Sequence, residues 1–154
     1  MKLIGFIRLF VLLIFLILTE TAVYPETIQY YEKPHTRLKY ITVYINNTPL
    51  EVLFDTGATD IILNADAVKA LGIKEFLRQG TANTVGGYVT QYSFIASSIR
   101  VGRIELRDIE VWYAPTASES ILGASFFSYF NYFIDEENRT ITFIEKGKKL
   151  YISP

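Results

Sequence analysis

The sequence predicts a mainly β protein of one domain with one or two short helices, preceded by an N-terminal apolar helix. Three observations support this fold class. Short runs of alternating apolar and polar residues, separated by Asn, Gly and Pro, recur from about residue 36 onward. One segment in the middle of the chain carries both the start and the stop signals of a helix. The 154 residues suffice for one compact core and are too few for two ordinary domains.

Residues 1–22 are strongly apolar and are predicted to form a signal peptide or a signal anchor. The uninterrupted part, Leu9–Leu18, has the length of a signal-peptide core. The whole apolar stretch, Leu3–Leu18, is somewhat short of the roughly 20 residues that span a bilayer, so both alternatives stay open. Lys2 and Arg8 precede the apolar run Leu9–Leu18, and Glu20 follows it. The positive-inside rule therefore places the rest of the chain outside the cytoplasm, anchored to the membrane or, after cleavage, secreted or periplasmic.

Residues 23–35 are predicted to be a linker, because Pro25 and Pro34 enclose a polar stretch without a sustained helical or strand period. The single histidine of the chain, His35, lies in this stretch and is expected to be exposed to solvent. The folded domain is accordingly expected to cover residues 36–154.

Strands dominate the predicted domain. Leu38–Ile45 and Pro49–Phe54 alternate in polarity and flank Asn46-Asn47, a pattern typical of a hairpin. The same reasoning predicts strands at Thr90–Ile95, Ser98–Val101, Ile104–Trp112 and Thr140–Glu145.

Two helices are predicted. The first covers Asn64–Leu71, because Asn64 can cap it, three alanines favour it and Gly72 follows its end. The second is short and covers Ser125–Tyr132, before a polar turn at residues 135–138.

Composition excludes several classes of site. The chain has no cysteine, so thiolate nucleophiles, disulfides and cysteine-rich zinc sites are ruled out. His35 lacks an apolar framework that could hold it in a Ser-His-Asp constellation. The formal net charge is -1 and the basic residues are dispersed, so no nucleic-acid partner is expected.

The passage that carries chemistry begins at Asp55, which ends an apolar strand. A carboxylate at this place is held rigidly and partly desolvated, which makes it a candidate acid or base. Thr56 can donate a hydroxyl hydrogen bond, and Gly57 lets backbone N–H groups approach the carboxylate. Taken alone, Asp-Thr-Gly is also compatible with an ordinary turn.

A second passage has the same layout, because the extended run at residues 119–124 contains Ile121-Leu122-Gly123 and precedes the second predicted helix. The glycine-rich Asn83–Tyr88 lies between the two passages. With these three elements the chain resembles the retropepsin-like aspartic proteases over about Leu38–Ile144. By this resemblance, Asp55-Thr56-Gly57-Ala58 would be the catalytic loop and Asn83–Tyr88 would be a flap.

The resemblance implies a closed β-barrel-like acid-protease lobe. The helix predicted at residues 64–71 is not a retroviral feature and favours the bacterial, membrane-associated members. The implied activity is that of an aspartic endopeptidase, in which two facing aspartates share one proton because like charges this close cannot both ionise.

Only one Asp-Thr-Gly is present, so Asp55 must meet the same residue of a second copy. The implied partners are therefore a second copy of the chain and a protein or peptide substrate. The dyad would activate a water molecule without a metal or cofactor. By resemblance, Thr56 would hydrogen-bond across the two-fold axis and keep the carboxylates coplanar.

The resemblance also implies which residues bind substrate. They are Ala58, Thr59 and Asp60 in the catalytic loop and Val85, Gly86, Gly87 and Tyr88 in the flap, whose backbone would bind the substrate as an added strand. Thr59 stands where retroviral members commonly have an aspartate, and the neighbouring Asp60 would substitute for it. An ordinary tight turn stays an alternative for the flap.

Two other functions stay open. An anchored β-domain of the same fold could bind or scaffold a partner without turnover. A small ligand-binding β-barrel could line a cavity with the 22 tyrosines and phenylalanines, although aromatic residues at strand period are more often core. The tail at residues 146–152 could be a terminal strand of a dimer sheet or a solvated end.

Overall fold

The structure, a computed structural model, describes residues 25–84 and 86–146. The predicted N-terminal apolar helix, and with it the signal peptide or anchor of residues 1–22, lies outside the described residues. Within the described ranges, no helix is both long and apolar enough to cross a membrane.

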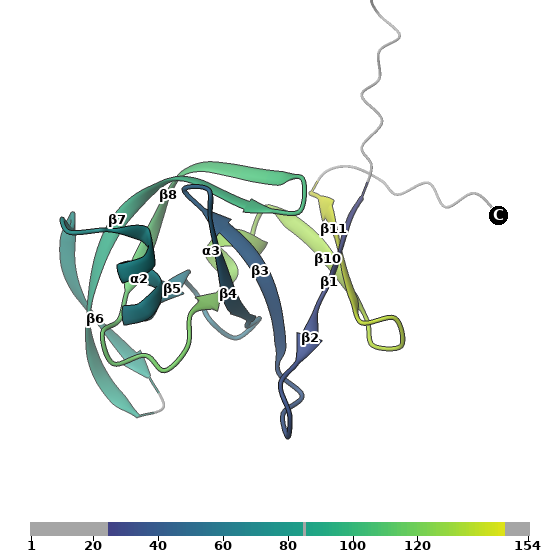
Figure 1. Cartoon of the computed structure of the whole chain (residues 1–154), viewed down its shortest axis with the longest axis horizontal. Coiled ribbons are helices and arrows are strands. Elements are labelled where there is room, and N and C mark those ends of the chain that lie inside the picture. The colour runs from purple at the N-terminus through teal and green to yellow at the C-terminus, as the bar shows by residue number, and fades with distance from the viewer. Residues whose placement is uncertain (1–24, 85, 147–154) are drawn as a thin grey trace, which may run out of the picture.

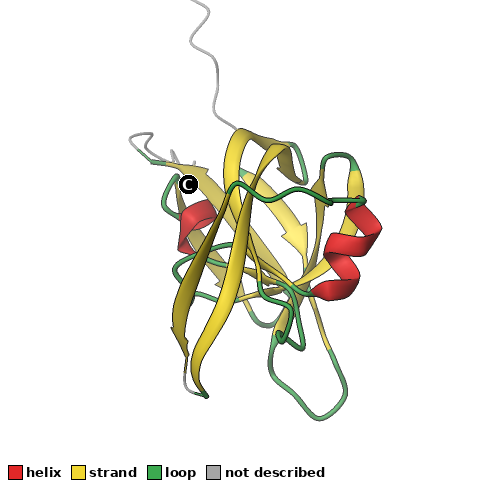
Figure 2. Ribbon diagram, turned by 90° about the vertical axis from the view of Figure 1, so that its left-hand side faces the viewer, coloured by secondary structure: helices red, strands yellow, loops and turns green. Residues whose placement is uncertain are grey.

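The described chain forms eleven strands and two short helices, which confirms a mainly β fold (Figures 1 and 2). The strands are β1 (Glu26–Gln29), β2 (Tyr31–Glu32), β3 (Lys39–Ile45), β4 (Thr48–Phe54), β5 (Ile62–Leu63), β6 (Arg78–Thr84), β7 (Gly87–Val101), β8 (Ile104–Tyr113), β9 (Ile121–Leu122), β10 (Phe130–Asp135) and β11 (Thr140–Glu145). The helices are α2 (Ala65–Leu71) and α3 (Ala124–Phe127).

The strands belong to two sheets. The larger has the order β2-β3-β4-β9-β5-β8-β7-β6, and an additional pairing of β3 with β7 brings it back on itself. The smaller has the order β1-β11-β10. In Figure 1 the smaller sheet lies on one side of the body, and α2, β6 and β7 lie on the other. The β6–β7 hairpin extends to the periphery of the body in both views (Figures 1 and 2).

The hairpin of β3 and β4 is confirmed. Asn46 and Asn47 form its two-residue turn with φ values of 48° and 65°, a left-handed conformation that asparagine tolerates better than most residues. Helix α2 is confirmed as well. The Asn64 side chain accepts a hydrogen bond from the Ala67 amide at 3.0 Å, and Gly72 ends the helix with a φ of 67°.

The interpretation of residues 23–35 as a linker is corrected by strands β1 and β2. β1 pairs antiparallel with β11, and β2 pairs with β3. Between them Tyr30 is only 4% exposed, and its hydroxyl donates to Glu136 at 3.0 Å. The signal was missed because β1 and β2 are too short to show a period and take their partners from distant parts of the chain. His35 is exposed, as expected.

The predicted helix at Ser125–Tyr132 is wrong for its second half. α3 ends at Phe127, and from Phe130 the chain forms β10, which pairs with β11 along its whole length. Aromatic residues favour strands over helices, and the ladder with β11 overrides the weak local helix signal. Because the helix ends early, Phe127 of α3 and Tyr132 of β10 come to line the same hollow.

Two strand predictions merge, and the strands β5 and β6 were missed. Thr90–Ile95 and Ser98–Val101 belong to a single long strand, β7, which pairs with β6 and β8. The polar sequence of β6 gave no apolar alternation, because most of its side chains are exposed.

The core is built from aliphatic and aromatic side chains that contact one another. The fully buried Phe126 ring lies 5.4 Å from Phe130 and 5.9 Å from Phe143, measured between ring centroids. Val43, Ile61 and other strand residues complete the core. These aromatic rings therefore serve packing, as aromatic residues at strand period usually do.

Candidate active site

Asp55 lies where the chain leaves β4. Its amide donates to the carbonyl oxygen of Leu122 in β9 at 3.2 Å, and the amide of Leu53 donates to that of Ser120 at 2.8 Å. β4 and β9 run parallel at this point. A neighbouring strand therefore fixes the backbone of Asp55. The residue is half-buried.

The loop after Asp55 turns tightly around its carboxylate. The Gly57 amide donates to Asp55 Oδ1 at 2.9 Å, and the Ala58 amide donates to the Asp55 carbonyl oxygen at 3.3 Å. A β-carbon on Gly57 would lie 3.3 Å from Asp55 Oδ1, so the turn leaves little room for a side chain. Thr56 at the tip of the turn is exposed. The structure thus places Asp55, Thr56, Gly57 and Ala58 in one tight turn directly after β4.

Gly123 lets the second passage pack closely against the first. After β9 the chain runs against the Asp55 loop, and the amides of Ala124 and Ser125 donate to the carbonyl oxygens of Ala58 and Thr59, each at 2.8 Å. A β-carbon on Gly123 would lie 2.8 Å from the Ala58 carbonyl oxygen. Because the φ of Gly123 is an ordinary -109°, space rather than backbone conformation requires glycine here.

Thr59 and Asp60 interact with each other. The Thr59 hydroxyl donates to Asp60 Oδ2 at 2.9 Å, and Thr59 is exposed whereas Asp60 is half-buried. Both residues belong to the same loop as Asp55. Their hydrogen bond directs the Asp60 carboxylate toward the Thr59 hydroxyl.

The predicted flap residues lie at the tip of the β6–β7 hairpin. The Thr84 hydroxyl donates to the Gly87 carbonyl oxygen at 2.8 Å, and Gly87 has a φ of 108°. Tyr88 is 80% exposed, so its ring does not pack on the Asp55 loop. Gly86 is exposed, and Val85 lies outside the described residues.

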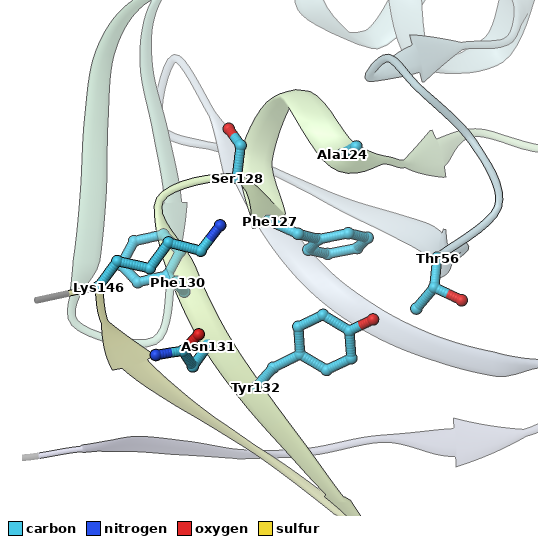
Figure 3. Close-up of a pocket in the computed structure, with 8 residues that line it drawn as sticks. All are labelled: Thr56, Ala124, Phe127, Ser128, Phe130, Asn131, Tyr132 and Lys146. Carbon is cyan, nitrogen blue, oxygen red and sulfur yellow. The ribbon is translucent and has the colours of Figure 1, made fainter. Parts of the chain in front are cut away.

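A hollow of about 440 Å³ opens beside the Asp55 loop. In Figure 3, Thr56 stands at one end and Lys146 at the other, with the rings of Phe127 and Tyr132 between them. Phe127 and Tyr132 also contact Phe54, at centroid distances of 4.4 and 5.5 Å. Sequence reasoning missed this hollow, because it assigned both rings to one helix instead of a helix and a strand.

An ionic cluster fixes the chain just before β9. The Tyr40 hydroxyl lies 2.8 Å from both carboxylate oxygens of Glu119, and Lys33 Nζ donates to Glu119 at 3.1 Å. Burial opposes ionisation of Glu119, but the hydrogen bonds from Tyr40 and Lys33 outweigh it and lower its pKa. Burial, and then the contact with Glu119, raises the pKa of Tyr40 to about 12.

The other side of this segment is held by the cap of α2. The buried Ser120 hydroxyl accepts from the Asn64 amide at 3.1 Å and donates to Asn64 Oδ1 at 3.2 Å. The strand that supports Asp55 is therefore anchored both to β3, through Tyr40, and to α2. No signal in the sequence pointed to these anchors, because they join residues more than 50 positions apart.

The Asp55 loop can place one carboxylate at the surface as a proton donor or acceptor. No group of three or more His, Cys, Asp or Glu that could hold a metal ion occurs in the part of the chain that the structure describes. The motif supplies a single acid, Asp55, in a loop whose backbone is held by hydrogen bonds to Leu122 and from Ala124 and Ser125.

Comparisons with known proteins agree with this geometry. The model of a family described as gag-polyprotein putative aspartyl protease matches residues 41–129. The structure is similar to that of a retropepsin-like aspartic protease from Rickettsia conorii, with a TM-score of 0.61 and 24% identity over 78% of this chain and 98% of that one. It is also similar to an EIAV protease complexed with the inhibitor HBY-793, with a TM-score of 0.51 and 25% identity over 64% of this chain and 92% of that one. No curated protein matches the chain.

Proposed function

Because the chain belongs to the family of gag-polyprotein putative aspartyl proteases, we propose that it is an aspartic endopeptidase, active as a homodimer in which each copy supplies Asp55. Its substrates are proteins or peptides.

The observation that carries the proposal is the support of Asp55. A catalytic carboxylate must be held in place by groups other than the substrate. The amide of Asp55 donates to Leu122, and the amide of Gly57 donates to the Asp55 carboxylate. An ordinary surface turn would not need a second segment packed as closely against it as Gly123 is packed against this loop. The arrangement supports a site in preference to a turn without a role.

The proposed reaction follows from two carboxylates that share one proton. The ionised Asp55 accepts a proton from a water molecule while the water oxygen attacks the carbonyl carbon of the scissile peptide. The protonated Asp55 of the other copy donates a hydrogen bond to the carbonyl oxygen. The C–N bond of the tetrahedral intermediate then breaks, and the leaving nitrogen takes up a proton from the dyad. Thr56 has a geometric role at the two-fold axis.

The β6–β7 hairpin is proposed to cover the substrate. It lies at the periphery of the body, and its tip residues Gly86, Gly87 and Tyr88 are free to contact a ligand, since Tyr88 is 80% exposed. An extended peptide would add to the hairpin as a strand. Ala58, Thr59 and Asp60 would contact the substrate from the opposite side.

We also propose that the domain works outside the cytoplasm, anchored or exported through residues 1–22. This rests on the apolar run Leu9–Leu18 and on the positive charges that come before it in the sequence. The hydrolytic activity does not depend on this part of the proposal.

The activity is tested with the full chain and its Asp55→Asn variant on a mixed peptide library from acidic to neutral pH. Asp66→Asn is the matched control, because Asp66 is an exposed residue of α2. We expect cleavage by the wild type and the control and none by Asp55→Asn. Cleavage should also rise more steeply than linearly with enzyme concentration where dimers dissociate.

Mixing gives a second criterion. An excess of Asp55→Asn should suppress wild-type cleavage, because mixed dimers hold only one of the two acids. Cleavage that survives in Asp55→Asn would overturn the proposal. A chain that binds peptides equally with and without the acid, and never cleaves them, would instead be a binding module of the same fold.

A further inference from the structure

The folded body begins almost directly after the apolar segment of the sequence. The apolar run ends at Leu18, and the first described residue is Pro25. β1 follows at Glu26 and pairs with β11 along its whole length. Residues 19–25 connect the two parts, and even a fully extended chain of this length spans at most about 25 Å. The connection between a membrane segment and the body is therefore short.

The start of β1 is fixed to the turn between β7 and β8. The Glu26 carboxylate accepts hydrogen bonds from the Arg103 amide, at 2.9 Å, and from the Arg103 guanidinium. The same guanidinium donates to the Pro25 carbonyl oxygen at 3.5 Å. A β-carbon on Gly102 would overlap the Glu26 carboxylate, so the turn and the start of β1 pack directly on each other. The end of the body that adjoins the apolar segment is therefore the end with the β7–β8 turn.

The tip of the β6–β7 hairpin lies at the other end of the body. β7 runs from Gly87 at the tip to Val101 at the turn, and its 15 residues would span about 50 Å if the strand were straight. In Figures 1 and 2 the start of β1 and the hairpin tip lie on opposite sides of the body. A compact domain of this length is about 35 Å across, which exceeds the connection of at most about 25 Å. The body therefore cannot turn over and point the hairpin at the bilayer.

The proposed dimer limits the orientation further. A two-fold axis relates the two copies and hence the two points at which they are attached. With both apolar segments in one bilayer, the two copies are equivalent with respect to it, so the axis stands on average along the membrane normal. Both hairpins then face the same way, and the short connections leave only the direction away from the lipid.

The β7–β8 turn is suited to a bilayer surface. Its acids are paired, Glu26 with Arg103 and Glu105 with Arg107. Arg100 adds a further positive charge beside the turn, with its guanidinium 4.0 Å from the centre of the Tyr44 ring. Arginine side chains bind the phosphate groups that lipid headgroups present. The charges of this end therefore do not oppose contact with a membrane.

We infer that the dimer stands on the membrane with the β7–β8 turn toward the bilayer and the β6–β7 hairpin away from it. This rests on the proposed function, which supplies the anchor and the two-fold axis. Substrate then binds between the hairpin and the Asp55 loop, on the side that faces the aqueous phase. The substrate class is accordingly an extended polypeptide segment that reaches this cleft from solution. Segments that lie at the lipid surface or within the bilayer are excluded.

The orientation is tested by energy transfer to the membrane. The chain has no cysteine, so single cysteines can carry a donor dye at two exposed positions. Glu105→Cys lies just after the β7–β8 turn, and Asn83→Cys lies near the hairpin tip. The full chain is reconstituted into phosphatidylcholine vesicles with an acceptor dye on the headgroups. We expect clearly stronger transfer from the cysteine at position 105 than from the cysteine at position 83.

The substrate class is tested with one peptide that the full chain cleaves in free solution. The peptide is attached to lipid headgroups through a spacer of about four residues, which reaches at most about 15 Å, or of about 30 Gly-Ser residues, with a mean length of about 30 Å. A spacer that cannot span two sites gives an effective concentration near zero, so the short-spacer peptide should be cleaved at least about tenfold more slowly. A soluble protease without an anchor must cleave both peptides equally.

A longer connection should remove this discrimination. About 20 Gly-Ser residues inserted before Pro25 add a mean length of about 25 Å, which lets the dimer tilt toward the surface. Cleavage of the short-spacer peptide should then approach that of the long-spacer peptide. The matched control carries the same insertion between Lys74 and Glu75, in the exposed loop between α2 and β6. It leaves the connection unchanged and should keep the discrimination.

The outcomes separate the orientation from the function. Equal transfer from the two cysteines, stronger transfer from Asn83→Cys, or a chain that the vesicles do not retain would overturn the orientation and leave the hydrolysis intact. Equal cleavage of the two anchored peptides would overturn the substrate class alone. A correctly oriented chain that never cleaves the free peptide would overturn the proposed function and, with it, the substrate class.

Discussion

Gly123 lies so close to Asp60 that a β-carbon at position 123 would be 2.3 Å from the Asp60 carbonyl oxygen. The atom it would meet belongs to the backbone of the loop that carries Asp55, so the clash cannot be relieved by rotating a side chain. This contact connects the second passage of the sequence with the first and makes the position of the candidate acid depend on a glycine in a distant segment of the chain.

We expect Gly123→Ala to destabilise the fold by about 2–3 kcal/mol, because the Asp55 loop must move to admit the methyl group. Urea unfolding of the variant and the wild type measures the difference. Gly86→Ala is the control, since its β-carbon would meet only Thr84 Oγ1, at 3.8 Å, and its cost should stay below about 0.5 kcal/mol. Equal effects of the two substitutions would contradict the steric argument.

Asn64→Ala should cost about 1–2 kcal/mol, the usual value for a lost helix cap. The Asn64 side chain accepts from the Ala67 amide and from the Ser120 hydroxyl, so α2 and the segment before β9 are both affected. Asn64→Ser should recover much of the loss, because serine also caps helices. Thermal unfolding measures both, with the exposed Asn83→Ala as control. A loss that serine does not reduce would assign the effect to Ser120 rather than to the cap.

The cluster of Lys33, Tyr40 and Glu119 predicts a pH dependence. The pKa of Glu119 in the folded state is lowered from its ordinary value of 4.5. Its ionised form therefore stabilises the fold above about pH 4.5, and this contribution is lost as the pH falls through the lowered pKa. Lys33 also pairs with Glu51, at 2.8 Å, so part of the cluster persists without Glu119.

Glu119→Gln should accordingly be less stable than the wild type near neutral pH and should approach it below about pH 4.5. The measurement is the urea midpoint of both proteins from acidic to neutral pH, with Glu105→Gln as a control in an exposed ion pair. A difference that does not change with pH would show that shape, not charge, is what Glu119 contributes.

Tyr88→Ala distinguishes a flap from an ordinary turn. Tyr88 is 80% exposed in the structure, so the stability should change by less than about 0.5 kcal/mol. If the hairpin closes over substrate and buries this ring, kcat/KM for a cleaved peptide should fall by about tenfold or more. Unchanged kinetics and unchanged stability together would mean that Tyr88 takes no part in substrate binding.

Local patterns in the sequence determined the parts of this protein whose contacts are near in the chain. The Asn46-Asn47 hairpin, helix α2 with Asn64 and Gly72 at its ends, and the Asp55 turn with Gly57 are of this kind, and the structure has each of them. A cap, a tight turn or a left-handed residue leaves its signature within a few positions, because the physical constraint is local.

Tertiary structure alone decided the elements whose partners are distant. β1 forms because β11 lies beside it, as the hydroxyl pair of Thr27 and Thr142 at 2.8 Å illustrates across 115 positions. Phe130 was predicted in a helix but begins β10, which also pairs with β11. This pairing places Tyr132 in the same hollow as Thr56. The energy of pairing two remote segments leaves no periodic pattern in either segment, so the hollow beside Thr56 could not be predicted from the sequence.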